Sequence, residues 1–416
     1  MSRRYSRRLR LVGGLTAAVT AAVLSTATLP AHAVPEGTVV DSGRAGSVGG
    51  SYLVTLEEGI KGASAAGRDV AARYGAKISH TYGTVLNGYA VEASAAQAGR
   101  LAADSRVASV VQDSRVRLAG TQTDTQTSTR TNTRSSTQKH PPSWGLDRVD
   151  QAGLPLNGAY TSPGSAGAGV TVYVIDTGVR ITHAHFGGRA SYGWDFVGND
   201  RSAGDGNGHG THVAGIIAGT RYGVAKKARI VSVRVLDDTG SGTTAQVIAG
   251  VDWVTAHARR PAVANLSLGG YHSAQLDTAV RNSIKAGVTY TVAAGNDGLP
   301  AARYSPADVS QALTVGATDR TDTRPGFSDY GSAVDLFAPG VAITSDANAS
   351  DTARATCSGT SMAAPHVAGA AALYLAGHRG ATPAQVAGAL IARAASGKVS
   401  DAGRGSPNRL LRVPES

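Results

Sequence analysis

The feature that most constrains the fold is an alternation of short apolar strands and helix-length segments that follows Trp144. The predicted strands are continuous apolar runs, which are typical of strands buried on both faces of a parallel sheet. Helices between parallel strands cover the two faces of such a sheet. We therefore predict an α/β fold with three layers and a central parallel sheet. The predicted strands are 170–175, 230–235, 263–268, 289–294 and 313–316, and the predicted helices are 209–218, 243–257, 274–286, one beginning near Ser361, and 383–393.

A separate unit precedes this pattern, over residues 50–112. Its strands are rich in β-branched and aromatic residues, and Ser94 is a typical N-cap for its second helix. The order of elements, β-α-β-β-α-β, predicts a ferredoxin-like α+β domain. The predicted elements are a strand at 51–56, a helix at 62–74, strands at 77–82 and 88–93, a helix at 94–103 and a strand at 107–112.

Two segments outside these units have compositions of their own. Residues 1–33 join five arginines, an apolar run and the small-residue site Ala31-His32-Ala33, which is the pattern of a secretory signal peptide. A membrane anchor is the alternative for this segment. Residues 121–139 contain no apolar residue and predict a flexible linker. We therefore predict a signal peptide at 1–33, a first domain at 34–120, a linker at 121–139 and a second domain at 140–416.

The net charge gives little information about partners. The formal charge is +11, and the five arginines of the predicted signal peptide supply nearly half of it. The remaining positive charges form no basic run, so nucleic acid is not an expected partner. Removal of the signal peptide leaves no expected membrane segment, and we predict a secreted, extracellular protein.

Three polar residues stand at ends of the predicted strands and helices. Asp176 ends a strand in Val-Ile-Asp-Thr-Gly, His209 begins a helix in Gly-His-Gly-Thr-His, and Ser361 begins another in Gly-Thr-Ser-Met-Ala-Ala-Pro-His. A serine nucleophile needs an imidazole base and a carboxylate that orients this base. Singly, each residue has a structural explanation as a turn, loop or cap residue, and His212 is a second candidate for the base.

The three motifs identify a family resemblance. Residues 140–411 resemble subtilisin-like serine proteases (subtilases) of the proteinase K branch, and in particular the aqualysin-like secreted bacterial enzymes. Residues 50–118 resemble their inhibitory propeptide. The resemblance implies that Asp176 orients, His209 is the base and Ser361 is the nucleophile, because the first histidine of the His-Gly-Thr-His string is the catalytic one.

The resemblance also implies a function. We expect a secreted serine endopeptidase of broad specificity that hydrolyses peptide bonds after apolar or aromatic residues. Its partners would be protein or peptide substrates and its own propeptide, which would inhibit it intramolecularly until autocleavage near residues 118–121. We expect a monomer without an organic cofactor. The alternatives are a non-catalytic binding protein on a protease scaffold and a secreted esterase, although an α/β-hydrolase would need Gly-x-Ser-x-Gly, which the chain lacks.

Further site residues follow from the same resemblance. Asn296 would help to bind the oxyanion, with a structural turn asparagine as the alternative. The substrate would lie as a strand between two enzyme segments. Thr244 would leave a distal pocket open. The expected substrate-binding residues are Gly240, Ser241 and Gly242 on one side, Ser267, Leu268 and Gly269 on the other, and Ala293, Ala294 and Gly295 around a wide, uncharged specificity pocket.

The chain departs from aqualysin-like relatives in the cysteines that would form stabilising disulfides. Their two disulfides would correspond to Gly206, Asp238, Ala302 and Ala333, and the single cysteine is Cys357. We interpret Cys357 as a small buried residue, with a reactive thiol as the alternative. Structural Ca²⁺ is the expected substitute for disulfides. Its predicted ligands are Asp335 and the carbonyls of Ser310 and Ala312, although Asp335 has the alternative role of a turn carboxylate.

Overall fold

The computed structural model describes residues 36–119, 121–127 and 137–413, with only the backbone of 121–127 described. The predicted signal peptide lies outside these residues. Residues from Glu36 onward form one compact unit. We call residues 36–119 the N-terminal region and residues 137–413 the C-terminal region. In the described part of the chain, no helix is both long and apolar enough to cross a membrane.

The N-terminal region has the predicted ferredoxin-like arrangement. Its antiparallel strands lie in the order β5-β2-β4-β3, and its two helices pack on one face through Val70, Ala71, Ala98 and Leu101. Ser94 is the N-cap of α2, as predicted, and it forms a reciprocal capping box with Gln97. The elements are β1 (Val39–Val40), β2 (Ser47–Leu56), α1 (Ala65–Arg73), β3 (Lys77–Tyr82), β4 (Gly88–Glu92), α2 (Ala95–Ala102) and β5 (Val107–Leu118).

A nine-stranded sheet forms the centre of the C-terminal region. In this sheet, each strand from β10 to β22 runs parallel to the next. Only β21 is antiparallel to its neighbour. In sheet order the strands are β10 (Ala190–Asp195), β11 (Arg229–Arg234), β9 (Thr171–Asp176), β13 (Ala262–Leu266), β15 (Thr289–Ala293), β17 (Leu313–Thr318), β18 (Leu336–Pro339), β22 (Arg409–Leu410) and β21 (Ala395–Ser396).

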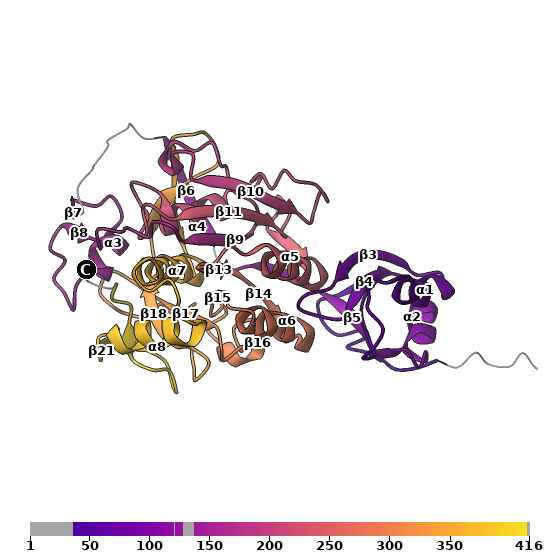
Figure 1. The fold of residues 1–416 in the computed structure, drawn as a ribbon. Helices are drawn as coiled ribbons and strands as arrows, with labels where there is room; N and C mark the ends of the chain where they lie inside the picture. Colours follow the sequence, from indigo (N-terminus) through magenta and orange to yellow (C-terminus); the bar gives the residue numbers. More distant parts are fainter. Residues whose placement is uncertain (1–35, 120, 128–136, 414–416) are drawn as a thin grey trace, which may run out of the picture. The chain divides into compact units, whose positions relative to one another are not determined.

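Helices cover both faces of this sheet, which confirms the predicted three-layer α/β fold (Figure 1). Side chains alternate between the faces: Val172 and Val174 of β9 pack with α4 and α7, and Tyr173 and Ile175 pack with α5 and α6. The helices are α3 (Trp144–Val149), η1 (Ala184–Phe186), α4 (His209–Ala218), α5 (Thr244–His257), α6 (Ala274–Lys285), η2 (Ala301–Arg303), α7 (Thr360–Gly377) and α8 (Pro383–Arg393).

The predicted elements of the C-terminal region are all present, with small changes at their ends. The strand predicted to end at 268 ends at Leu266, and a new short strand begins at Leu268. In the N-terminal region, the strand predicted at 107–112 continues to Leu118, because it gains new partners in the C-terminal region. Strand periodicity alone does not reveal such partners.

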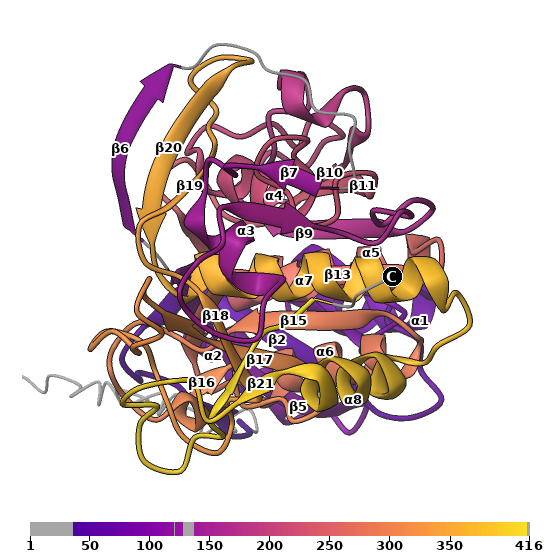
Figure 2. The same ribbon diagram turned by 90° about the vertical axis from the view of Figure 1, so that its left-hand side faces the viewer.

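The prediction of a flexible linker at 121–139 is wrong at both ends, because strands form there. β6 pairs with β20, beside which it lies in Figure 2, and β7 pairs with β8. Backbone hydrogen bonds to a partner strand do not require apolar side chains, which explains why composition missed this order. These and the other short strands are β6 (Thr121–Thr127), β7 (Thr137–Lys139), β8 (Ala159–Thr161), β12 (Ser241–Thr243), β14 (Leu268–Tyr271), β16 (Tyr304–Ser305), β19 (Ile343–Asp346) and β20 (Ala353–Ser358).

Candidate active site

Asp176 and His209 form a hydrogen-bonded pair at the carboxyl end of the parallel sheet. Asp176 is the last residue of β9 and is fully buried, and His209 is the first residue of α4. The His209 Nδ1 atom lies 2.8 Å from the Asp176 Oδ1 atom. The backbone N–H of Thr177 donates to the same oxygen at 2.7 Å. The other ring nitrogen, Nε2, is buried and has no hydrogen-bond partner among the described residues, so it is available to accept a proton.

Asp205, which sequence reasoning did not select, holds the start of α4 in place. Its carboxylate accepts hydrogen bonds from the Thr177 hydroxyl at 2.9 Å, the Gly208 amide at 2.8 Å and the Thr211 amide at 2.9 Å. A carboxylate at a helix N-terminus is favoured by the unpaired N–H groups there. The position of an acidic residue four residues before His209, in Gly-Asp-Gly-Asn-Gly-His, is the signal that could have found it.

Ser361 stands in the first turn of α7, where the sequence placed it. Its hydroxyl donates to the backbone carbonyl of Ser267 at 3.0 Å, and the Ser267 hydroxyl donates to the Ser361 carbonyl at 3.0 Å. The Ser361 hydroxyl is therefore engaged away from the free Nε2 atom of His209 in this conformer. A rotation about the Ser361 Cα–Cβ bond would redirect the hydroxyl without any movement of α4 and α7, which pack against each other.

Asn296 follows β15 and is fixed by Thr360, the residue before Ser361. The side-chain oxygen of Asn296 accepts hydrogen bonds from the Thr360 amide and the Thr360 hydroxyl, both at 2.9 Å. An amide side chain carries its donor on the other atom, so these contacts leave the Asn296 Nδ2 group as a donor for another partner. Thr360 is a positioning residue that the sequence analysis missed.

The end of β5 occupies the position predicted for a bound peptide. It pairs antiparallel with β12 on one side and β14 on the other, with Gly242 and Gly270 both opposite Val116. The Leu118 amide donates to the Gly240 carbonyl at 3.2 Å, and the Ala119 amide donates to the Ser267 carbonyl at 3.3 Å. These strands, together with Gly240 and Ser267 directly before them, contain the segments predicted to bind substrate, Gly240-Ser241-Gly242 and Ser267-Leu268-Gly269.

The carbonyl of Ala119 lies at the nucleophile. The backbone amide of Ser361 donates to the Ala119 oxygen at 3.1 Å. A backbone N–H at the start of a helix is a suitable donor for a carbonyl oxygen that gains negative charge during acyl transfer. The Ala119 carbonyl is therefore held by the backbone N–H group of the candidate nucleophile.

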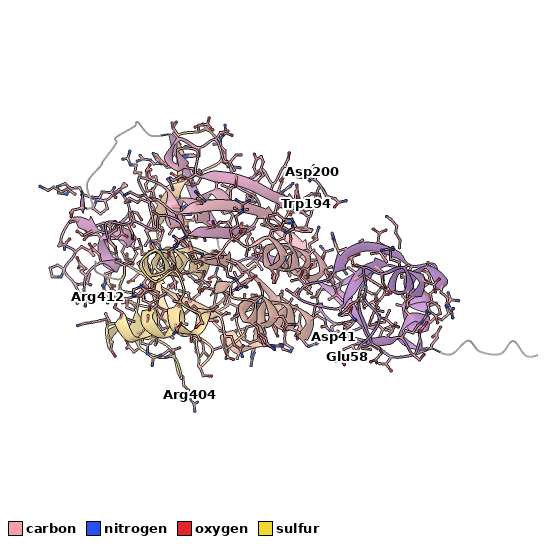
Figure 3. The ribbon with its side chains drawn as sticks, viewed as in Figure 1. Asp41, Glu58, Trp194, Asp200, Arg404 and Arg412 are labelled. Carbon is pink, nitrogen blue, oxygen red and sulfur yellow. The ribbon has the colours of Figure 1, made fainter. Side chains whose placement is uncertain are left out.

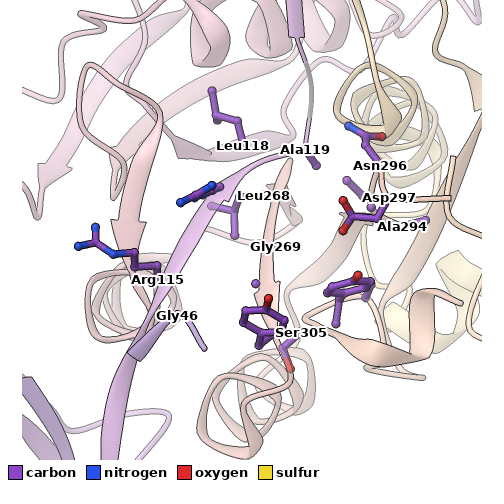
Figure 4. A pocket seen from close by; sticks show the side chains of 17 residues that line it. Gly46, Arg115, Leu118, Ala119, Leu268, Gly269, Ala294, Asn296, Asp297 and Ser305 are labelled. Atoms are coloured by element: carbon purple, nitrogen blue, oxygen red, sulfur yellow. The ribbon is translucent and has the colours of Figure 1, made fainter. Parts of the chain in front are cut away.

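A cavity of about 410 Å³ lies beside Ala119 (Figure 4). Ala293, Ala294 and Gly295, the residues predicted to wall the specificity pocket, line part of it. The cavity as a whole has charged residues in its lining, Arg115, Arg117 and Asp297, and the uncharged specificity pocket stays a prediction. Burial, followed by a hydrogen bond from the Tyr304 hydroxyl to Asp297, raises the pKa of Tyr304 to about 12. The cavity thus joins small apolar walls to the Asp297 carboxylate and to two arginines of β5, Arg115 and Arg117.

His212, the competing base, has a different environment from His209. Its Nε2 atom donates to the carbonyls of Ile343 at 3.1 Å and Ala355 at 3.2 Å, which belong to the β19–β20 hairpin. Burial lowers the pKa of His212 to about 3, so the ring stays neutral and structural. Cys357 lies on the same hairpin and is buried, in keeping with its interpretation as a small packing residue.

Asp335 is the predicted calcium ligand, and its side chain is partly buried. One carboxylate oxygen accepts the Thr314 amide at 2.8 Å, and burial raises the pKa of Asp335 to about 6. A bound cation would offset this burial cost, and one carboxylate with backbone carbonyls is a donor set that suits Ca²⁺. Two other groups of side chains lie close enough together to hold a metal ion. They are His183, His185 and Asp346, and His272, Asp277 and Asp308.

Comparisons with known proteins agree with this site. The Subtilase family model matches residues 167–411, which is more than half of the chain. The chain belongs to the subtilase family. A second match, to Peptidase inhibitor I9, covers residues 51–119 of this subtilase. Both results confirm the family and the inhibitory propeptide that the sequence predicted.

Similar proteins extend the comparison. An extracellular serine proteinase of a Thermus species is 46% identical over 340 residues, which is 82% of the subtilase and 78% of the relative. The crystal structure of a cold adapted subtilisin-like serine proteinase matches with a TM-score of 0.64 and 54% identity, over 66% of the subtilase and 98% of that chain. Fervidolysin from Fervidobacterium pennivorans matches with a TM-score of 0.71 and 23% identity, over 93% and 64% of the two chains, and shows the fold alone. The subtilase is thus a serine peptidase of the subtilisin type.

Proposed function

We propose that this subtilase is a secreted serine endopeptidase that is made as a zymogen and processes itself. Asp176, His209 and Ser361 would form its catalytic triad, and the Asn296 side chain and the Ser361 amide would bind the oxyanion. The observation that carries the proposal is the contact of the Ser361 amide with the Ala119 carbonyl, while β5 lies between β12 and β14. A peptide bond of the chain itself thereby lies where a substrate bond would react.

The proposed chemistry needs a rotation of the Ser361 side chain that brings its hydroxyl to His209, whereas the His209–Asp176 hydrogen bond is already formed. The Ser361 oxygen attacks the peptide carbonyl while the His209 Nε2 atom takes the hydroxyl proton, and Asp176 stabilises the imidazolium through Nδ1. His209 then gives the proton to the leaving amine, and an acyl-enzyme remains on Ser361. Water hydrolyses this ester with His209 as the base. The two oxyanion donors act in a water-poor site, where their effect on the transition state is largest.

The same contact predicts the processing site. The carbonyl at the Ser361 amide belongs to Ala119, so the first bond to be cut is Ala119–Gly120. Ala293, Ala294 and Gly295 supply small apolar walls beside Ala119, which supports broad cleavage after apolar or aromatic residues. The cut N-terminal region would stay bound as an inhibitor until it dissociates or is digested.

Calcium and secretion belong to the same proposal. Asp335 with the Ser310 and Ala312 carbonyls would hold a structural Ca²⁺, and the bound ion would stabilise the folded state by mass action. The arginines, apolar run and Ala31-His32-Ala33 site at the N-terminus support export.

Replacement of the nucleophile tests the function. The full-length Ser361→Ala chain should remain uncut when pure, and hydrolysis of casein should fall by about 10⁴-fold or more. The unmutated chain should yield a new N-terminus at Gly120 by N-terminal sequencing. Ser332→Ala, which changes an exposed serine, is the matched control and should process normally. Cutting of pure Ser361→Ala at Ala119–Gly120 would show that the processing is not the work of this site.

A further inference from the structure

The chain continues past the predicted scissile bond as a paired strand. β6, which starts two residues after Ala119, runs antiparallel to β20 with Thr121 opposite Ser358 and Thr127 opposite Ala353. β20 itself ends three residues before Ser361. The peptide on one side of the Ala119 carbonyl therefore lies between β12 and β14. The peptide on the other side lies along β20, beside which Figure 2 shows β6.

The directions of the β20 backbone groups show which residues of β20 bind β6. The Ala353 carbonyl accepts the Ala347 amide, and the Gly359 amide donates to the Gly340 carbonyl, so these two residues face the β19 side. Backbone groups alternate along a strand, so those of Arg354, Thr356 and Ser358 face β6. Their partners across the pair are Gln126, Asp124 and Thr121.

β20 is held firmly beside the nucleophile. The buried His212 ring, three residues after His209, donates to the carbonyls of Ile343 and Ala355 on the two strands of the hairpin. One helix, α4, thus positions both the candidate base and the hairpin. When β6 leaves, β20 becomes an edge strand with unpaired backbone groups, which is a template for another extended chain.

We propose that β20 is an extended docking edge for the substrate on the leaving-group side of the scissile bond. It would bind the backbone of an extended polypeptide as far as the eighth residue after that bond, the place that Thr127 occupies in the zymogen. The proposal rests on the proposed function and adds a substrate class: unfolded segments with eight residues or more beyond the cut, free of proline at the positions that donate to β20.

Substrate length and backbone methylation test this docking edge. All substrates carry residues 116–119 before the bond, and they end at Thr121 or at Thr127. Two further long substrates carry N-methyl groups, at the Asp124 and Gln126 positions in one and at the Thr125 and Thr127 positions in the other. The enzyme is prepared from a full-length chain with Asp124→Pro and Gln126→Pro, so that its own linker does not compete for β20.

The expected order of kcat/KM is specific. The long substrate should exceed the short one by about tenfold, mainly through a lower KM, because a few net hydrogen bonds form along β20. Methylation at Asp124 and Gln126 should remove this gain, and methylation at Thr125 and Thr127 should preserve it. Equal kcat/KM for long and short substrates, or equal effects of the two methylation patterns, would overturn the proposal.

Amide hydrogen exchange gives a readout that does not need catalysis. In the full-length Ser361→Ala chain, the amides of Asp124 and Gln126 should exchange at least tenfold more slowly than those of Thr125 and Thr127. Equal exchange at all four amides would refute the pairing. Protection of the first two amides in a chain whose unmutated form hydrolyses nothing would support the β6–β20 pairing but refute the proposed function and, with it, the role of β20 in binding substrate.

Discussion

At the scale of single residues, the candidate triad is partly assembled. The His209–Asp176 hydrogen bond is formed, whereas the Ser361 hydroxyl donates to the Ser267 carbonyl and the Nε2 atom of His209 has no partner among the described residues. The motifs and the family resemblance predicted that Asp176 pairs with His209, whereas the side-chain rotamer of Ser361 depends on local contacts that the motifs do not contain. The supporting roles of Asp205 and Thr360 were not predicted either, since each residue acts through hydrogen bonds that form only in the folded chain.

The Asn296 donor is the most direct test at this scale. Asn296→Asp keeps an oxygen for the Thr360 amide but removes the N–H group that would bind the oxyanion. We expect kcat to fall by at least about 10²-fold with little change in KM, because this contact strengthens only in the transition state. Steady-state kinetics on a peptide substrate measure both parameters. The exposed Asn157→Asp change is the control, and an effect of Asn296→Asp on KM alone would contradict the role.

His366 should make folding stability depend on pH. Burial lowers the pKa of His366 to about 4, below its unfolded value of about 6.5. Its neutral form therefore contributes fully above pH 6.5, and this contribution, on the order of 3 kcal/mol, is lost as the pH falls toward 4. Asp335, whose pKa is raised, has the opposite dependence, so only a difference between variants isolates His366.

The matched comparison uses urea unfolding at several pH values. In the full-length Ser361→Ala background, His366→Gln should show a shallower loss of unfolding free energy between pH 6.5 and 4 than the parent. The variant is prepared at pH 7. The test compares how the unfolding free energy of each chain changes with pH, so a difference in stability at pH 7 does not affect it. Equal slopes in both chains would show that His366 does not titrate as its burial implies.

At the scale of elements, the candidate binding cleft is formed by strands that are too short to be recognised from the sequence as strands. β12 and β14 carry few apolar side chains, and the family resemblance, rather than periodicity, identified their residues as substrate-binding. Their glycines matter sterically: a Cβ atom at Gly240, whose φ is +77°, would come within 2.5 Å of the Leu118 side chain. The N-terminal region is held by a second set of contacts on α5, outside the cleft.

Asp252 on α5 is the centre of this second set. Its carboxylate accepts the amides of Gly83, Thr84 and Val85, at 3.3, 2.8 and 2.8 Å. Asp252→Ala should weaken inhibition by the N-terminal region about 10- to 100-fold, because hydrogen bonds to a charged group are lost. Activity of the processed enzyme should not change.

The inhibition constant of the N-terminal region toward processed enzyme measures this effect. Glu58→Ala removes a carboxylate that is exposed on the N-terminal region, labelled in Figure 3, and should leave the inhibition constant unchanged. Equal inhibition of parent and Asp252→Ala enzymes would mean that the β5 contacts in the cleft supply nearly all of the affinity.

At the scale of the whole molecule, the chain has no intramolecular disulfide available, because Cys357 is its only cysteine. Gly206 and Asp238, which correspond to one disulfide of aqualysin-like relatives, do lie together: a Cβ atom at Gly206 would meet the Asp238 carboxylate. The two positions are thus neighbours in the fold, although no disulfide joins them. Ligand binding is one remaining route to added stability.

Removal of calcium should therefore destabilise the protein through Asp335. A chelator should lower the Tm of the full-length Ser361→Ala chain, and Asp335→Asn should reduce this response. Calcium affinity should also fall as the pH drops below about 6, because a proton then competes for the carboxylate whose pKa is raised to that value. Asp401→Asn is the control at another carboxylate. An unchanged calcium response in Asp335→Asn would place the ion elsewhere.

The sequence by itself determined the architecture and the identities of the candidate catalytic residues. Apolar runs separated by helices require a covered parallel sheet, and Asp176, His209 and Ser361 stand at element ends that such a sheet brings to one edge. Local signals of this kind, including the cap at Ser94, are read directly from neighbouring residues.

Only the tertiary structure decided what lies against what. The order of 121–127, the Asp297 wall and the contact of Ala119 with Ser361 depend on partners more than a hundred residues away in the chain. A segment such as β6, with no apolar residue, is ordered by its pairing with the backbone groups of β20, and these groups are the same for nearly every sequence. Side-chain patterns therefore cannot reveal such an edge, and the folded chain must supply it.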